Sequence, residues 1–114
     1  MYNQGDILLI PIPFRDLKTN KKIPVLVLSN SNYNSNNQDI VVAAITSNIE
    51  QKEYAVTIAS DDLDEGELKY ESVIRADKIY SLSQAIVLKK FGAVNKRVMQ
   101  LTNSEVNQLI NINN

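Results

Sequence analysis

The stretch from residue 39 to residue 46 reads Asp39-Ile40-Val41-Val42-Ala43-Ala44-Ile45-Thr46. Between its two polar ends the apolar run is uninterrupted, and most of its side chains are branched at Cβ. A short, continuous apolar run of this kind is typical of a strand buried on both faces of a sheet. We therefore expect residues 39–46 to form the most buried strand of the fold.

Further stretches on either side have the composition of strands, because branched apolar residues dominate them and polar segments bound them. Pro11 and Pro13 lack the backbone N–H that a central strand needs, so the first strand should lie at an edge or end in a bulge. The predicted strands cover residues 7–14, 23–29, 54–58, 72–80 and part of 85–94. Polar loops are expected at residues 15–22, 30–38 and 60–71.

The apolar period changes near residue 94. From there, the residues of one face recur every three to four positions, which is the spacing of a helix: Val94, Val98, Leu101, Glu105 or Val106, and Leu109. Asn95 is suited to cap the helix start. Residues 102–105 have the form of a capping box, so the tail is predicted to be one helix or two that break near Thr102.

This order predicts a mainly β fold of five to six short strands with a C-terminal α-helix. Short strands without intervening helices are typical of a small barrel or sandwich. The chain has 114 residues, a length that suits a single domain, so residues 1–114 are expected to form one domain.

Composition excludes several kinds of chemistry. The chain contains no Cys and no His, so disulfides, thiolate zinc sites, Cys nucleophiles and an imidazole base are ruled out. We expect no metal site and no cofactor. The longest apolar runs are well short of the roughly 18 residues that a spanning helix needs. The N-terminus lacks a basic start before an apolar stretch and does not resemble a signal peptide. A cytoplasmic protein that enters no membrane is expected.

The net charge of −1 hides a strong pattern along the chain. Residues 1–24 carry a net charge of +2, residues 50–71 a net charge of −6, and residues 75–97 a net charge of +5. If the two basic segments meet in space, they form a patch suited to a polyanion. A solvated surface of mixed charge is the alternative, and charge alone favours it.

Three groups of side chains are candidates for chemistry. Arg75 and Asp77 should share one face of their strand, about 6–7 Å apart at the backbone. They form either a surface salt bridge worth about 0–1 kcal/mol or a functional pair, and spacing alone favours the salt bridge. The hydroxyls of Thr46 and Ser47 end the apolar strand, where they either bind phosphate or cap a turn. The basic loop 15–22 either grips phosphate or is solvated.

Taken in order along the chain, these segments resemble the MazF/PemK (Kid) family of toxin endoribonucleases, over about residues 4–110. The matching segments are Gly5-Asp6-Ile7-Leu8-Leu9-Ile10, Pro13-Phe14, a basic loop, Pro24-Val25-Leu26-Val27-Leu28-Ser29, Val41-Val42-Ala43-Ala44-Ile45-Thr46-Ser47 and Ser72-Val73-Ile74-Arg75-Ala76-Asp77-Lys78-Ile79. The resemblance implies an SH3-like barrel that forms a homodimer and is neutralised by an antitoxin. It also implies metal-independent, sequence-specific cleavage of single-stranded RNA, mostly mRNA. The ribose 2′-OH would attack the adjacent phosphate, leaving a 2′,3′-cyclic phosphate and a 5′-OH.

The resemblance also suggests roles for individual residues. Asp77 would be the base, and Arg75 would stabilise the phosphorane or act as the acid, of which charge stabilisation is favoured because arginine is a very weak acid. These roles reverse the preference for an ordinary salt bridge. Thr46 and Ser47 match a Thr-Ser pair that contacts the scissile region. The basic side chains expected to bind RNA are Arg15, Lys18, Lys21, Lys22 and Lys78. Tyr33 or Tyr54 either stacks on a base or is half-buried packing.

Two departures from the family pattern keep other functions open. MazF-like members usually have Arg directly before the Pro of the second strand, where this chain has Ile23. The catalytic His of the PemK branch is also absent. Lys21 or Arg15 would then supply the missing charge. The alternatives are a toxin that does not cleave RNA, such as the gyrase poison CcdB, which shares this fold, or a weakened member that binds RNA or an antitoxin.

Overall fold

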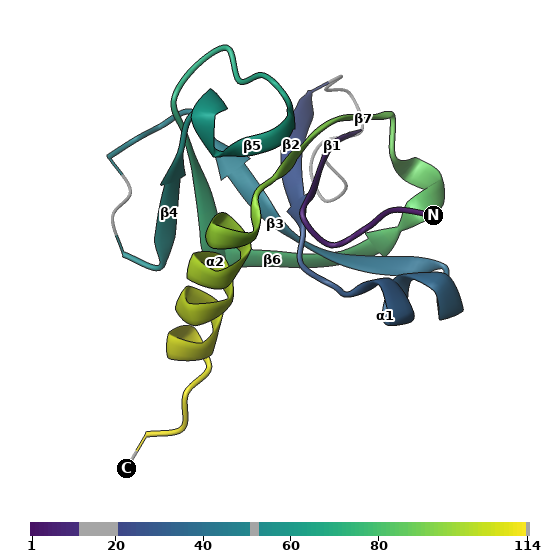
Figure 1. The fold of residues 1–114 in the computed structure, drawn as a ribbon. Coiled ribbons are helices and arrows are strands. Elements are labelled where there is room, and N and C mark those ends of the chain that lie inside the picture. The colour runs from purple at the N-terminus through teal and green to yellow at the C-terminus, as the bar shows by residue number, and fades with distance from the viewer. Residues whose placement is uncertain (12–20, 51–52, 114) are drawn as a thin grey trace.

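The computed structural model describes residues 1–11, 21–50 and 53–113. Within these ranges the chain forms seven strands, two α-helices and two 3₁₀ turns (Figure 1). The strands are β1 (Asp6–Pro11), β2 (Lys22–Val27), β3 (Asp39–Thr46), β4 (Ala55–Ile58), β5 (Leu63–Gly66), β6 (Ser72–Ser83) and β7 (Lys89–Val94). The helices are α1 (Ser31–Asn36) and α2 (Lys96–Leu109), and the 3₁₀ turns are Ser60–Asp62 and Gln84–Ile86.

The strands pair antiparallel in one sheet with the order β4-β6-β3-β2-β1-β7-β5. The sheet curls strongly, and α2 packs against β4 and β6 (Figure 1). The predicted mainly β, barrel-like fold with a C-terminal helix is therefore confirmed, with seven strands rather than five or six.

Both faces of the middle strands are buried, as the apolar run of β3 predicts. Alternate residues of each strand point to opposite faces of a sheet. Two separate apolar clusters result. One consists of Ile7, Leu26, Ala43, Ile45, Val56, Ile58, Ile74, Val94 and Val98. The other consists of Leu8, Ile10, Val25, Val27, Ile40, Val42 and Leu82. Val98 belongs to α2, so the helix completes the first cluster.

Two segments predicted as loops contain regular structure. Within residues 30–38, α1 is capped by Asn30, whose side chain accepts a hydrogen bond from the Tyr33 N–H. The buried Asn34 amide donates to the carbonyls of Tyr2 and Ser29. Asn30 thus caps the helix locally, as Asn side chains often do, whereas the bond from Asn34 to Tyr2 ties α1 to the N-terminal segment.

Within residues 60–71, β5 pairs with β7. Gly66 has a φ of +82°, and a Cβ there would collide with the Phe91 carbonyl oxygen. Glycine therefore permits the close approach of these two strands.

The tail is one helix, so the predicted alternative of a break near Thr102 is wrong. The Asn95 side chain accepts a hydrogen bond from the Val98 N–H at 2.9 Å and caps the start, as expected. The Thr102 hydroxyl is buried and donates to the Val98 carbonyl at 2.8 Å. Thr102 therefore bonds back along a continuous helix instead of beginning a new one.

The first strand does not lie at an edge, since β1 pairs with β2 on one side and β7 on the other. Its pairing with β7 ends at Leu9, so the missing N–H of Pro11 breaks no bond of that ladder. The register shift in the β1–β7 pair lies between Ile7 and Leu8, before the proline. Pro13 lies outside the described residues. In the described part of the chain, no helix is long and apolar enough to cross a membrane.

Candidate active site on the β6 bulge

Strand β6 breaks its register with β3 at the predicted site. Ala43 pairs with Ile79, but the next residue of β3, Ala44, pairs with Arg75. The three intervening residues of β6, residues 76–78, therefore have no partner in this register. Such an insertion is a bulge, which bends a strand and redirects its side chains. Asp77 is the middle residue of the bulge.

Arg75 and Asp77 form a two-bond ion pair at this bulge. Arg75 Nη2 lies 2.8 Å from Asp77 Oδ2, and Arg75 Nε lies 3.1 Å from Asp77 Oδ1. This is the fork geometry in which a guanidinium binds a carboxylate most strongly. The predicted proximity of the two side chains is thus confirmed. They remain 27% and 26% exposed, so a ligand can reach both of them.

The pair changes the acidity of both partners. The hydrogen bonds from Arg75, together with its positive charge, lower the pKa of Asp77 below its ordinary value. Lys78 lowers the pKa of Asp77 further, and burial opposes both effects. The same hydrogen bonds raise the pKa of Arg75. Asp77 is therefore a carboxylate and Arg75 a cation at neutral pH.

The neighbours of Arg75 across the sheet are small. Residues directly opposite one another in an antiparallel pair share a face. Arg75 lies opposite Ala44 of β3 and opposite Ala55 of β4. Because only methyl groups flank it on both sides, the partly exposed guanidinium is not covered by large neighbouring side chains. A phosphate, which presents two oxygens of its tetrahedral group to a guanidinium, can approach it there.

The two hydroxyl residues are placed differently from each other. Thr46 lies opposite Val73, two residues from Arg75, so Thr46 and Arg75 are diagonal neighbours on one face of the sheet. The Thr46 hydroxyl accepts a hydrogen bond from the Asn48 N–H at 3.1 Å, as in a turn cap, and keeps its own proton to donate. Ser47 is exposed in the turn that follows β3.

The basic residues predicted to bind RNA are only partly described. Lys78 is exposed on the bulge beside Asp77. Lys21 and Lys22 are exposed where β2 begins. Arg15 and Lys18 lie outside the described residues.

Two tyrosines interact with the bulge or with Arg75 in ways that the sequence does not predict. Tyr54 directly precedes β4, and its carbonyl accepts a hydrogen bond from the Ala76 N–H of the bulge at 2.8 Å. Tyr80 follows the bulge, and its phenol contributes to the raised pKa of Arg75. No sequence signal identifies either, because both contacts depend on where the bulge falls.

The comparisons with known proteins agree with this fold. A family model for the PemK-like, MazF-like toxin of type II toxin–antitoxin systems matches residues 3–110. The chain belongs to this family. No curated protein sequence matches it significantly.

Several solved structures share the fold of this PemK/MazF-family chain, and two of the following three are MazF proteins. An endoribonuclease in complex with its cognate antitoxin, from Mycobacterial species, is 18% identical with a TM-score of 0.79, covering 99% of this chain and 98% of that one. MazF from Deinococcus radiodurans is 18% identical with a TM-score of 0.77, covering 97% of each chain. The Mycobacterium tuberculosis toxin MazF-mt6 is 16% identical with a TM-score of 0.75, covering 95% of this chain and 98% of that one.

Ile23, where MazF-like members usually have Arg, lies on the same face of the sheet as Arg75. Val25 is opposite Ala44, and Ala44 is opposite Arg75. Continuing that register by two residues brings Ile23 level with Thr46. Ile23 is half-buried and packs against the second apolar cluster. The position therefore lies beside the candidate site but carries no charge.

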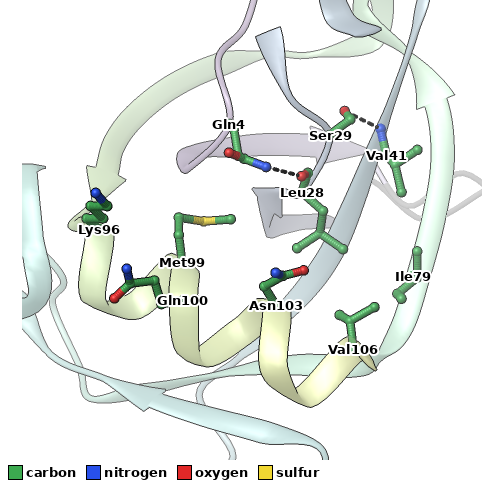
Figure 2. Close-up of a pocket in the computed structure, with 10 residues that line it drawn as sticks. All are labelled: Gln4, Leu28, Ser29, Val41, Ile79, Lys96, Met99, Gln100, Asn103 and Val106. Atoms are coloured by element: carbon green, nitrogen blue, oxygen red, sulfur yellow. Dashed lines mark hydrogen bonds between the residues drawn. The ribbon is translucent and has the colours of Figure 1, made fainter. Parts of the chain in front are cut away.

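A groove of about 470 Å³ lies between α2 and a wall formed by β3, β6 and the residues that follow β2 (Figure 2). Its wall is largely apolar, with Leu28, Val41, Ile79, Met99 and Val106 among the residues that line it. The residues that line this groove include neither Arg75 nor Asp77. The groove and the ion pair are thus separate features of this PemK/MazF-family fold.

Proposed function

We propose that this protein is the toxin of a type II toxin–antitoxin system and cleaves single-stranded RNA, mostly mRNA, at specific sequences. The observation that supports this function is the partly exposed, two-bond Arg75–Asp77 pair, presented on a bulge, with alanines flanking Arg75. RNA cleavage by the 2′-OH needs a base and a positive charge at the phosphate. The pair supplies both within one hydrogen-bonded unit.

In this mechanism Asp77 accepts the proton of the ribose 2′-OH as its oxygen attacks the adjacent phosphorus. Arg75 donates hydrogen bonds to the phosphorane oxygens as their negative charge develops. The guanidinium then turns partly from Asp77 toward the phosphate. That movement raises the basicity of Asp77 at the moment when it must take the proton.

The bond from phosphorus to the 5′-oxygen then breaks, leaving a 2′,3′-cyclic phosphate and a 5′-OH. The leaving oxygen takes its proton from solvent, which reaches the exposed pair. Arg75 is too weak an acid to supply that proton, since arginine stays protonated in proteins and the hydrogen bonds to Asp77 raise the pKa of Arg75 further. Thr46 and Ser47 would contact the scissile region. The lysines at residues 21, 22 and 78, with Arg15 and Lys18, would hold the RNA backbone.

We propose that this reaction needs no metal. The base is a carboxylate and the positive charge at the phosphate comes from a guanidinium, so both of these roles have a protein group, and solvent supplies the proton for the leaving oxygen. The sequence has no His and no Cys, which are the side chains that most often bind transition metals. The reaction should therefore proceed in a chelator.

We also propose a homodimer that binds a cognate antitoxin in the cytoplasm, where mRNA is found. Membership of the toxin family supports the antitoxin. Three of the structural neighbours are described as complexes, one with a cognate antitoxin and two of MazE with MazF.

The first test is cleavage of a long single-stranded RNA by the purified protein in EDTA. We expect discrete cuts that leave cyclic phosphate ends. The matched control is the double variant Arg75→Ala/Asp77→Ala, which should leave the RNA intact. Cuts that persist in the double variant would remove the pair from the reaction.

A weakened member of the family that only binds RNA or antitoxin is the second candidate. Ile23 favours it, because an apolar side chain stands where MazF-like members have a cation beside this face. A folded protein that binds RNA without cutting it would support this candidate. Cleavage that appears in Ile23→Arg would then show that the missing charge is the cause.

Removing the two lysines at the start of β2 should weaken RNA binding and its salt dependence. Each lost phosphate contact reduces the slope of log K against log salt by about 0.7 on a single strand. The double variant Lys21→Ala/Lys22→Ala should therefore have a slope shallower by about 1.4, measured by fluorescence anisotropy with an RNA that carries 2′-deoxyribose at the cut site. Lys69→Ala/Lys89→Ala, which removes two exposed lysines elsewhere, is the control. Equal slopes in both double variants would show that Lys21 and Lys22 contact solvent and not the RNA phosphates.

A further inference from the structure

Tyr54 has a backbone conformation that side chains rarely adopt. Its φ is +50°, and among the residues that the structure describes, no other non-glycine residue has a positive φ. Left-handed backbone is uncommon outside Gly, Asn and Asp, because Cβ then crowds the carbonyl oxygen. Tyrosine is not chosen for such a turn by its own preference, so the surrounding structure must hold it there.

Tyr54 lies at the point where the backbone pairing of β6 with its two neighbouring strands changes. Ala55 pairs with Arg75, and the hydrogen bond from the Ala76 N–H to the Tyr54 carbonyl is the next contact along this ladder. On the other side of β6, the register with β3 skips residues 76–78. The Tyr54 carbonyl is therefore a backbone anchor for the first residue of the bulge. The Ala76 side chain, which is fully buried, is a second anchor.

The left-handed turn also decides where β4 begins. An extended residue at position 54 would let the chain before it continue along β6, opposite Asp77 and Lys78. Such pairing would draw the bulge into a regular ladder and turn its side chains to new directions. With φ at +50°, the chain leaves the sheet at the level of Ala76. Asp77 then remains outside the ladder, and the bulge sets the geometry of its two-bond pair with Arg75.

We propose that Tyr54 is a positioning residue for the candidate site. Its left-handed backbone ends the pairing of β4 with β6 at the level of Ala76, and so preserves the bulge that presents Asp77 to Arg75. This role deepens the proposed RNA cleavage and rests on it for its effect on rate. The role of Tyr54 is played by its backbone, and its aromatic ring is not required.

Three substitutions separate the backbone from the ring. Tyr54→Asn removes the ring but tolerates positive φ, whereas Tyr54→Val removes the ring and strongly resists positive φ. Tyr54→Ala is intermediate and serves if the valine variant does not fold. We expect kcat to fall at least tenfold in Tyr54→Val with KM within twofold of the parent, and to stay within twofold in Tyr54→Asn.

A second readout needs no RNA. The pKa of Asp77, followed by ¹³C NMR of its carboxyl carbon, should stay below its ordinary value in the parent and in Tyr54→Asn. It should rise toward that value in Tyr54→Val, with Tyr54→Ala between, because the fork to Arg75 loosens. If the parent protein cuts no RNA, the proposed cleavage fails, while this titration still tests the positioning role.

Two results would overturn the positioning role. Equal losses of kcat in Tyr54→Asn and Tyr54→Val would show that the ring matters, as in stacking on a base. An Asp77 pKa that is the same in all the variants would show that the bulge holds its shape without the left-handed turn.

Discussion

Replacing Asp77 with Asn should slow RNA cleavage by about 10²-fold or more while RNA affinity changes little. The amide keeps the size of the carboxylate and can still contact Arg75 through its oxygen. It cannot accept the proton of the 2′-OH, because its charge and basicity are gone. The rate is measured under single-turnover conditions with excess protein. Affinity is measured with an RNA that carries 2′-deoxyribose at the cut site.

The matched control is Asp64→Asn, which neutralises an exposed aspartate of β5. It should cleave RNA at the parent rate. The parent's pH profile is a second check, because Asp77 must be ionised to act as the base. Since the pKa of Asp77 is lowered, kcat/KM should hold as pH falls to the ordinary range of aspartate and decline only below it. Parent-like cleavage by Asp77→Asn would exclude Asp77 as the base.

Much of the fold follows from local sequence patterns. The apolar run of residues 39–46 predicts β3 with its observed bounds, and both faces of β3 are buried. Asn95 and the helical period predict the start of α2. These features depend on the residues of one segment, so a single segment is enough to predict them.

Features that depend on distant contacts were missed. Asn and Ser dominate the segment around α1, and locally they favour turns. The helix is nevertheless supported by Gln84, whose side chain donates to the carbonyls of Asn34 and Asn37. Likewise, β5 exists because Gly66 can approach β7. No residue inside either segment indicates these partners.

For the candidate site as well, the sequence predicts which residues are neighbours but not the geometry that the strands impose on them. Spacing predicts that Arg75 and Asp77 are neighbours, and they are. The bulge that sets their geometry depends on how β6 aligns with both β3 and β4, which is a property of three strands. Tyrosine prefers strands, so nothing in the sequence predicts the left-handed turn at Tyr54.

Replacing Arg75 with Lys should reduce the single-turnover cleavage rate by about 10²- to 10³-fold, as does the loss of one donor to the charge that develops in a transition state. Lysine keeps the positive charge but lacks the planar fork, so it cannot bind Asp77 and the phosphorane through paired donors. The positive charge remains, so ground-state RNA affinity should fall much less than the rate.

Arg97→Lys is the matched control for this substitution. Arg97 lies near the start of α2, is 71% exposed and meets Asp62 only at 3.8 Å, so its replacement should leave the cleavage rate unchanged. Arg75→Ala should lose at least as much rate as Arg75→Lys and more affinity, because it removes the charge as well. If Arg75→Lys instead cleaves at the parent rate, charge alone is sufficient at position 75. The two-bond geometry with Asp77 would then serve the stability of the bulge and not the stabilisation of the phosphorane.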